Sequence, residues 1–232
     1  MKSILTDVTC TLLPGKYAHG DRVPELYNEA YRYWRKTWGE IFTKAGSPAS
    51  LNTENFLRQN IVICLHQGNR IVGMLTQTFF NIRADATYDH AYLQPFPQHL
   101  IKALRASSGG FVTTAEYLSV HSDFRRSIIG VSLSEVLLGI LSRVFTESEG
   151  RMLLATTVRP ARVHESCAKF GWQEVGVVQK YGLDCILMHS DLRTTCTHPD
   201  RAVASLIDDY WAQRQDWTGL TVEEQPIIRR AA

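Results

Sequence analysis

The sequence lacks long apolar runs and lacks any signal for export. No stretch approaches the roughly 18 consecutive apolar residues that a membrane-spanning helix needs. Asp7 and other polar residues interrupt the short apolar stretch at the start of the chain before the core of a signal peptide can form. We therefore expect a cytoplasmic protein with no transmembrane segment.

Paired cysteines and a strong net charge are also missing. The five cysteines are odd in number and widely spaced, with no CxxC pair and no cysteine and histidine cluster at zinc spacing. This argues against a disulfide scaffold and against a bound metal. The net charge is only +2, which does not predict a nucleic-acid partner. A local basic patch that suits phosphates is still expected from Arg125, Arg126, Arg159 and Arg162.

The chain contains no internal repeat, no low-complexity segment and no polar linker. Its 232 residues are 44% apolar and 21% charged, which is enough apolar material for one large core. We expect a single domain over residues 1–232, with a core at about 24–192 and a helical C-terminal extension at about 193–232. The oligomeric state stays open, with a homodimer among the alternatives.

Apolar spacing predicts alternating helices and strands. Helices are expected at 24–46, 97–106, 131–150, 160–170 and 199–214, and strands at about 61–66, 70–80, 111–120, 151–158, 172–180 and 183–189. The order from 111 to 158 is strand, arginine-rich loop, apolar helix and strand, which predicts two parallel neighbouring strands. The loop then lies at a helix N-terminus, where backbone N–H groups and the helix dipole attract anions.

Two segments carry a specific resemblance. The stretch VHSDFRRSIIGVSLSEVLL is similar to the GNAT acyltransferase segment V-x-P-[DE]-[YF]-[RQ]-x-x-G-x-[GA]-x-x-L-[LM], with matches at Val120, Asp123, Phe124, Arg125 and Gly130. The stretch RVHESCAKFGWQEVG resembles the family's second signature, with matches at Lys169, Gly171, Trp172 and Gly176. The chain therefore resembles the GNAT superfamily, near its N-acyl amino acid synthases and acyl-homoserine lactone synthases.

The resemblance implies an α/β (α+β) fold in which a mixed central sheet of about six or seven strands is flanked by helices and two parallel strands splay apart. It places an acyl thioester beside Tyr117 to Val120. The co-substrate is acyl-CoA, with an acetyl or longer chain, or an acyl-phosphopantetheine carrier protein. The residues implied to surround this donor are Leu118, Val120, Arg125, Arg126, Ser127, Ile128, Ile129, Gly130, Val131 and Ser132.

Two departures from the family pattern leave parts of this picture open. Ile128 stands where the family has the first glycine of its phosphate loop, so a bulky side chain must turn away before the backbone can touch a pyrophosphate. A carrier-protein donor would depend less on this loop. Cys167 stands where many members have a tyrosine thought to protonate the leaving thiolate. The cysteine is either a proton donor, a nucleophile or a small core residue.

Direct aminolysis of a thioester needs a neutral amine and therefore a base. The candidates are Glu116, which alternation puts on the strand face of Leu118 and Val120, and His121 at the strand end. Each also has a structural interpretation, as an exposed carboxylate at the sheet margin and as a polar residue at a strand end. Tyr33 and Trp34, together with Tyr117, are expected to border the acceptor, although an aromatic stripe at helical spacing is also typical of a core.

These features favour an N-acyltransferase that moves an acyl group from a thioester to the primary amine of a small molecule. The lactone synthases usually carry an acidic residue and an arginine where this chain has Thr114 and Tyr117, which disfavours that subgroup. The alternative is a non-catalytic domain that binds acyl thioesters and has a regulatory role. A serine or cysteine hydrolase is disfavoured because no G-x-S-x-G motif accompanies Ser166 or Cys167.

Overall fold

The computed structural model describes residues 5, 7–106, 109–148, 150–191 and 197–219. The strands are β1 (Thr9–Pro14), β2 (Ile61–Gln67), β3 (Arg70–Gln77), β4 (Phe79–Asn81), β5 (Phe111–Val120), β6 (Met152–Val158), β7 (Gln173–Lys180), β8 (Leu183–Ser190) and β9 (Gln215–Asp216). The α-helices are α1 (Glu25–Lys44), α2 (Glu54–Leu57), α3 (Asp85–Tyr88), α4 (Gln98–Ala106), α5 (Arg126–Ile129), α6 (Leu133–Glu147), α7 (Val163–Ala168) and α8 (Arg201–Ala212). Three 3-10 turns lie at Pro48–Ser50, Ser122–Phe124 and Arg159–Ala161.

The strands form one mixed sheet in the order β7-β8-β6-β5-β3-β2-β1-β9, with β4 beside β5. The pair β5–β6 is parallel, as the sequence predicts, and the short β9 runs parallel to β1. The other neighbouring pairs are antiparallel. The nine described strands exceed the expected six or seven because β1 and β9 were not foreseen and the predicted strand at 70–80 is divided into β3 and β4.

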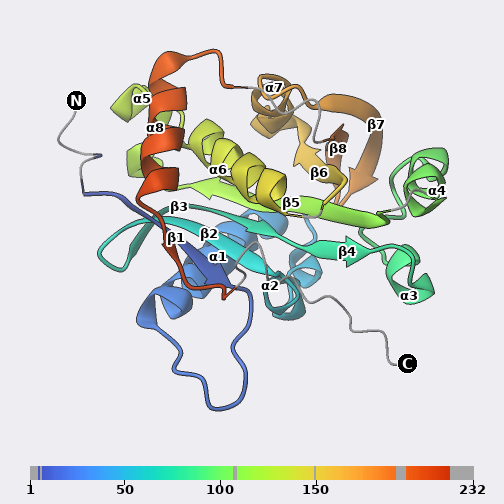
Figure 1. Cartoon of the computed structure of the whole chain (residues 1–232), viewed down its shortest axis with the longest axis horizontal. Helices are drawn as coiled ribbons and strands as arrows, with labels where there is room; N and C mark the ends of the chain where they lie inside the picture. The colour runs from blue at the N-terminus through green and yellow to red at the C-terminus, as the bar shows by residue number, and fades with distance from the viewer. Residues whose placement is uncertain (1–4, 6, 107–108, 149, 192–196, 220–232) are drawn as a thin grey trace.

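Helices cover both faces of the sheet, with α6, α7 and α8 on one face and α1 and α2 on the other (Figure 1). Helix α6 is apolar around most of its circumference because it lies between the sheet and α8. Gly139 permits this close approach, since a Cβ there would lie 2.2 Å from Cδ1 of Ile207 on α8. Glu135 of α6 contacts two further segments. Its carboxylate lies 2.6 Å from Nζ of Lys169, after α7, and 3.0 Å from Nε2 of His198, before α8.

The opposite face holds two aromatic clusters. One gathers the inward stripe of α1 around Trp34 and Phe56, which are both almost fully buried. The other lies beneath α4 and the segment before it, around Tyr92 and Phe96. Glu116 comes from β5, the strand that contributes to both clusters.

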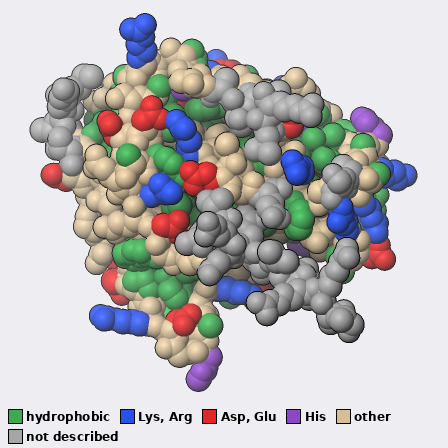
Figure 2. Space-filling view, in the orientation of Figure 1, with side chains coloured by type: hydrophobic (Ala, Val, Ile, Leu, Met, Phe, Trp, Pro, Cys, Tyr) green, Lys and Arg blue, Asp and Glu red, His purple; other side chains and the backbone are tan. Residues whose placement is uncertain are grey.

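The long elements confirm the periodicity argument, since each predicted helix and strand has a counterpart in the structure. The predicted helix at 160–170 is shorter than expected, because a 3-10 turn takes its beginning and α7 starts only at Val163. Within the described ranges, no helix has the length and apolar character to span a bilayer. On the face shown in Figure 2, acidic and basic side chains are interspersed, as a small net charge suggests.

Candidate active site

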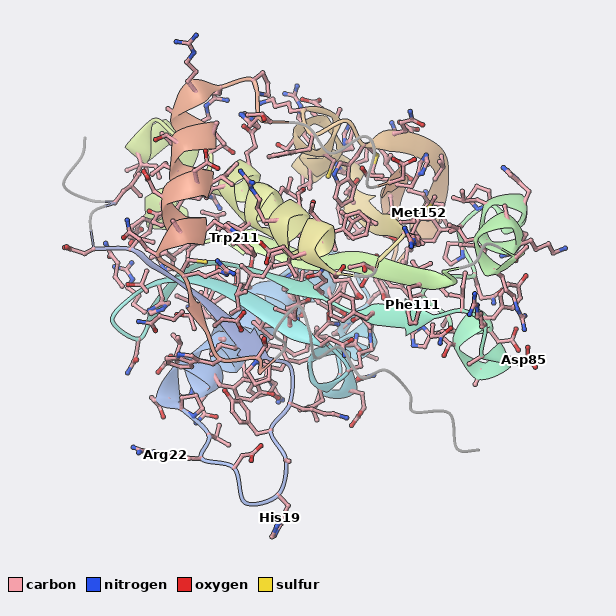
Figure 3. The ribbon with its side chains drawn as sticks, in the orientation of Figure 1. His19, Arg22, Asp85, Phe111, Met152 and Trp211 are labelled. Carbon is pink, nitrogen blue, oxygen red and sulfur yellow. The ribbon has the colours of Figure 1, made fainter. Side chains whose placement is uncertain are left out.

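The parallel strands β5 and β6 pair along only half of their length. Their register runs from Val112 opposite Met152 to Ala115 opposite Ala155. Strand β5 then continues to Val120 and β6 to Val158. Phe111 and Met152, labelled in Figure 3, mark the end at which the strands are paired. The strands therefore splay beyond Ala115, in agreement with the fold that the sequence resembles.

A bulge in β5 lies next to this opening. Glu116 pairs with Thr76 and Ser119 pairs with Met74, so two residues of β5, Tyr117 and Leu118, lie opposite one residue of β3. Tyr117 has a φ of +54°, a left-handed conformation that is rare for a bulky residue. Its carbonyl accepts a hydrogen bond from Nε1 of Trp38 at 3.3 Å, which helps to hold the bulge.

The bulge changes which side chains share a face. Leu118 and Val120 pack against the core beneath α6, whereas Tyr117 packs among the aromatic residues of α1. Glu116 hydrogen-bonds to Arg58, on the α1 and α2 side of the sheet. The expectation that Glu116 shares the face of Leu118 and Val120 was wrong, because the extra residue reverses the alternation between them.

An apolar cavity of about 460 Å³ occupies the splayed region. We call it the cleft. It reaches both faces of the sheet, since α1, α6 and α7 all contribute to its wall. Its lining consists of Trp38, Ile41, Lys44, Ala45, Leu75, Ala115, Tyr117, Leu118, Leu138, Ala155, Thr156, Thr157, Val158, Pro160, Ala161, Val163, Cys167 and Leu183. Such a cleft suits a long, thin and mostly apolar ligand.

A smaller cavity of about 50 Å³ adjoins the cleft, and we call it the chamber. Its walls carry most of the ionisable groups near the splayed strands. The lining consists of Trp38, Phe42, Tyr92, Ala115, Glu116, Tyr117, Thr156, Val158, Lys180, Tyr181 and Cys185. Trp38, Ala115, Tyr117, Thr156 and Val158 line both spaces, so a ligand group in the chamber lies beside the contents of the cleft.

Glu116 is buried and its two carboxylate oxygens are engaged. Oε1 accepts hydrogen bonds from Nη1 of Arg58 (2.9 Å) and Oγ1 of Thr114 (2.7 Å), and Oε2 accepts from the other guanidinium nitrogen of Arg58. Burial by itself lowers the pKa of Arg58, but the charge and hydrogen bonds of Glu116 outweigh it and raise the pKa above its ordinary value. The Glu116 carboxylate is therefore engaged in an ion pair with Arg58 and is not available as a free carboxylate.

Lys180, at the end of β7, brings a second cation to the chamber. Its Nζ lies 4.8 Å from the centroid of the Tyr92 ring and 5.1 Å from that of Tyr181. Burial lowers the pKa of Lys180; Arg58 acts in the same direction and Glu116 acts against it. None of the described carboxylates lies within ion-pair distance of Lys180, so Glu116 acts on it only from further away.

Cys167 lies on α7, in the wall of the cleft, and only 1% of its surface is exposed. Burial raises the pKa of its thiol to about 12. At neutral pH the thiol is therefore protonated and poorly suited to act as a nucleophile, because the thiolate is the reactive form.

The other sequence candidates lie around these cavities or away from them. His121 follows β5, accepts a hydrogen bond from the backbone N–H of Asp123 at 3.3 Å and does not line the cleft or the chamber. Trp34 is 1% exposed and packs edge-on against Tyr117, behind the cavity wall. Tyr33 lies near His121, with ring centroids 6.5 Å apart. Tyr117 is the predicted acceptor-side residue that lines both cavities.

The predicted phosphate loop forms a short turn, α5, before α6. The amides of Ile128 and Ile129 donate to the carbonyl of Arg125, and that of Gly130 donates to the carbonyl of Arg126. In this conformation these three amides are occupied and do not point freely at a ligand. The side chain of Ile128 turns outward, 58% exposed, whereas Ile129 is buried.

The ends of this loop differ in exposure. Arg125 and Arg126 are exposed, and Val131 is half-buried. Ser132 is the N-cap of α6, and its hydroxyl accepts a hydrogen bond from the amide of Glu135 at 3.4 Å. Ser127 lies in α5. The loop thus presents two cations in front of the first turn of a 15-residue helix.

Sequence reasoning missed Tyr92, Lys180 and Tyr181 of the chamber, and it missed Arg58, which pairs with Glu116 in the chamber wall. They come from three separate places in the chain, and no local motif links these places. A weak signal existed in Lys180-Tyr181-Gly182, a turn between two predicted strands that ends one strand with a basic and an aromatic residue. No set of three or more histidine, cysteine or acidic side chains within the described residues is placed to bind a metal.

Comparison with solved structures agrees with this architecture. The structure of BjaI, described as a CoA-dependent acyl-homoserine lactone synthase with SAM and isopentyl-CoA, matches with a TM-score of 0.57 and 12% identity over 90% of this chain and 93% of that one. FeeM, an N-acyl amino acid synthase from uncultured soil microbes, matches with a TM-score of 0.56 and 11% identity over 80% and 92%. The chain has the GNAT fold. No protein-family model and no curated protein matches the sequence.

The GNAT fold locates the two sequence signatures in space. The first spans the end of β5, the α5 turn and the start of α6, and the second spans α7 and the start of β7. Both adjoin the splayed strands, since α6 and α7 line the cleft. At 11–12% identity the likeness establishes the fold, and the residues of the cleft and the chamber carry the argument about function.

Proposed function

We propose that this protein is an N-acyltransferase that moves an acyl group from a thioester to the primary amine of a small molecule. The observation that carries the proposal is the splayed end of β5 and β6, with its apolar cleft of about 460 Å³ joined to a chamber that Glu116 and Lys180 line. An acyl thioester needs an apolar slot, and the attacking amine needs a polar space beside the carbonyl. The two adjoining cavities supply both.

In the proposed complex, the acyl chain and the thioester occupy the cleft, and the amine enters through the chamber. The bulge at Tyr117 interrupts the ladder between β3 and β5, which leaves a main-chain amide between Tyr117 and Val120 to donate to the developing oxyanion. The donor's phosphate would meet Arg125, Arg126 and the first turn of α6. Attack then forms an amide and releases the thiol.

The α5 turn bears on the choice of donor. A pyrophosphate bound as in the GNAT family needs loop amides, and those of Ile128, Ile129 and Gly130 already donate within the turn. Either the turn opens when acyl-CoA binds, or the donor is a carrier protein, whose phosphopantetheine has no adenosine pyrophosphate. Both donors belong in the test.

The experiment is to incubate the protein with acetyl-, octanoyl- or palmitoyl-CoA, or with octanoyl-carrier protein, and an equimolar pool of amino acids and polyamines. Released thiol and the masses of new amides are measured. The amino acids are included because FeeM is described as an N-acyl amino acid synthase. A new amide together with released thiol supports the proposal. Saturable binding of a donor without thiol release for any donor would instead identify a non-catalytic binding domain.

A further inference from the structure

The chamber contains several groups that titrate, but few of them can accept a proton from an amine. Glu116 has both carboxylate oxygens occupied by Arg58 and Thr114. Burial raises the pKa of Tyr92, Tyr117, Tyr181 and Cys185, so these groups stay protonated at neutral pH. In the cleft, Cys167 is protonated for the same reason. The remaining cation of the chamber is Lys180.

We propose that Lys180, in its neutral form, is the base that deprotonates the acceptor amine. The inference rests on the proposed N-acyltransferase activity. Lys180 lines the chamber together with Ala115 and Tyr117, the residues of β5 at which the cleft and the chamber meet. An amine that reaches the thioester carbonyl from the chamber therefore passes the Lys180 side chain.

The charges around Lys180 allow both of its protonation states. Arg58 and Glu116 neutralise each other, and burial lowers the pKa of the nearby His90, so a neutral Lys180 leaves this region without net charge. Burial and Arg58 favour the neutral amine, whereas Glu116 favours the ammonium, and Cys185 would add to that effect only as a thiolate. The Tyr92 and Tyr181 rings also stabilise the ammonium through their faces. A group balanced in this way can take up a proton and release it again within one turnover.

The step balances in atoms and charge. The acceptor ammonium gives one proton to the neutral Lys180 amine, and the nitrogen lone pair then attacks the thioester carbonyl carbon. A C–N bond forms and the carbonyl π pair moves to oxygen. When the carbonyl re-forms, the C–S bond breaks, the nitrogen gives a second proton to the thiolate, and Lys180 later releases its proton to solvent. The products are an amide, a thiol and one proton.

The test separates a base from a fixed cation. Lys180→Arg keeps the positive charge but does not deprotonate, because the guanidinium pKa is above about 12. Steady-state kinetics with octanoyl-CoA, or with octanoyl-carrier protein if that is the active donor, and the amine found above are measured from pH 6 to 10. We expect Lys180→Arg and Lys180→Met to lose roughly 100-fold or more in kcat, the usual contribution of a general base. In the unmodified protein kcat should rise with pH to a plateau whose apparent pKa is below 10.5.

Lys102→Met, at an exposed position on α4, is the matched control and should keep the unmodified kcat. A Lys180→Arg protein with unmodified kcat and pH profile would overturn the base assignment and leave Lys180 as a fixed cation. Absence of turnover in the unmodified protein would overturn the proposed function, and the base assignment with it.

A second measurement needs neither turnover nor a stable variant. Trace acetylation of the unmodified protein by acetic anhydride, followed across pH by peptide mass spectrometry, reports the protonation of each lysine separately. We expect the labelling midpoint of Lys180 to fall below that of Lys102 in the same sample. An equal or higher midpoint contradicts the proposed role, because such a lysine would hold its proton near neutral pH.

Discussion

Glu116 lies beneath the sheet, where Arg58 meets its carboxylate with two hydrogen bonds. Only 6% of the Glu116 side chain is exposed. Replacement of Arg58 by methionine would leave this carboxylate buried and uncompensated, and removal of one partner of a buried pair costs about 3–5 kcal/mol. We expect Arg58→Met to lower the free energy of unfolding by about 3 kcal/mol in urea titrations at pH 7.

The control for this prediction is a double-mutant cycle. Glu116→Gln removes the charge but keeps an oxygen that can accept from Thr114. The double variant Arg58→Met, Glu116→Gln should therefore be more stable than Arg58→Met alone, since no charge remains unpaired. A loss below about 1 kcal/mol in Arg58→Met, with no coupling in the cycle, would mean that water already compensates the carboxylate.

Cys167 provides a second prediction at this scale. A thiol whose pKa is raised from 9.0 to about 12 is a weaker acid than an ordinary leaving thiol, so proton transfer from it to the thiolate is uphill. We expect Cys167→Ala to keep kcat within about threefold and the unmodified protein to form no acyl adduct on Cys167 by mass spectrometry. A fall in kcat beyond 100-fold would restore Cys167 as the proton donor.

Residue-level prediction from the sequence failed where one backbone angle decides the outcome. Alternation assigned Glu116, Leu118 and Val120 to one face, but the positive φ of Tyr117 separates them. No residue type signals this conformation, because it is held by tertiary contacts such as the Trp38 hydrogen bond. For the same reason the sequence did not predict that Arg58 and Lys180 lie near Glu116, since the three residues come together only after the sheet has formed.

At the scale of elements, the splay between β5 and β6 sets the depth of the cleft. Ala115 and Ala155 are the last paired residues of β5 and β6 before the strands separate, and both small side chains line the cleft. Leucine at position 155 would fill part of this space, at a strain cost of about 1–3 kcal/mol. We expect Ala155→Leu to lower kcat/KM for octanoyl-CoA at least tenfold relative to acetyl-CoA.

The comparison of the two donors in one protein separates this effect from misfolding, which would lower both rates together. Thr157→Val on the same strand is the control for volume, because Thr157 also lines the cleft and the change preserves side-chain volume while removing the hydrogen bond that its hydroxyl donates to the Ile186 carbonyl. If Ala155→Leu leaves the ratio of kcat/KM for octanoyl-CoA to kcat/KM for acetyl-CoA unchanged, the acyl chain does not reach the Ala115–Ala155 pair.

Elements with clear periodicity were predictable, and those held only by long-range contacts were not. Helix α6 and strands β5 to β8 follow from apolar spacing and from their glycine and proline boundaries. Strand β1 was not predicted because it is buried on both faces, with Leu12 packed in one core cluster and Leu13 in the other. Its sequence therefore does not alternate between apolar and polar residues. The two-residue strand β9 is too short to leave a pattern.

At the scale of the molecule, the sequence predicted the parallel pair, its splay and the helix that follows, because two signatures with a defined separation encode them. The chamber was not predictable, since α1, β5, β6, β7, β8 and the segment around Tyr92 contribute to it from distant parts of the chain. Charge complementarity between these segments exists only in the folded protein. The residues proposed to hold the donor are thus encoded by two local motifs, whereas those proposed to receive the acceptor come together only in the folded protein.

Burial of thiols makes the whole molecule sensitive to alkali. Burial raises the pKa of Cys64 and Cys185, and it raises the pKa of Cys10 and of Cys167 from 9.0 to about 12 each. Between those values the unfolded chain ionises while the folded chain stays protonated, so stability is complete below about pH 9 and falls as the pH rises toward 12. At pH 10 Cys10 and Cys167 should each lower the free energy of unfolding by about 1.4 kcal/mol relative to pH 7.

Urea titrations at both pH values measure this loss. Cys10→Ala should recover about 1.4 kcal/mol of this loss, whereas Leu12→Ala, which destabilises the same strand without removing a thiol, should keep the full decline. Equal declines in the two variants would show that Cys10 ionises in the folded protein as readily as in the unfolded chain.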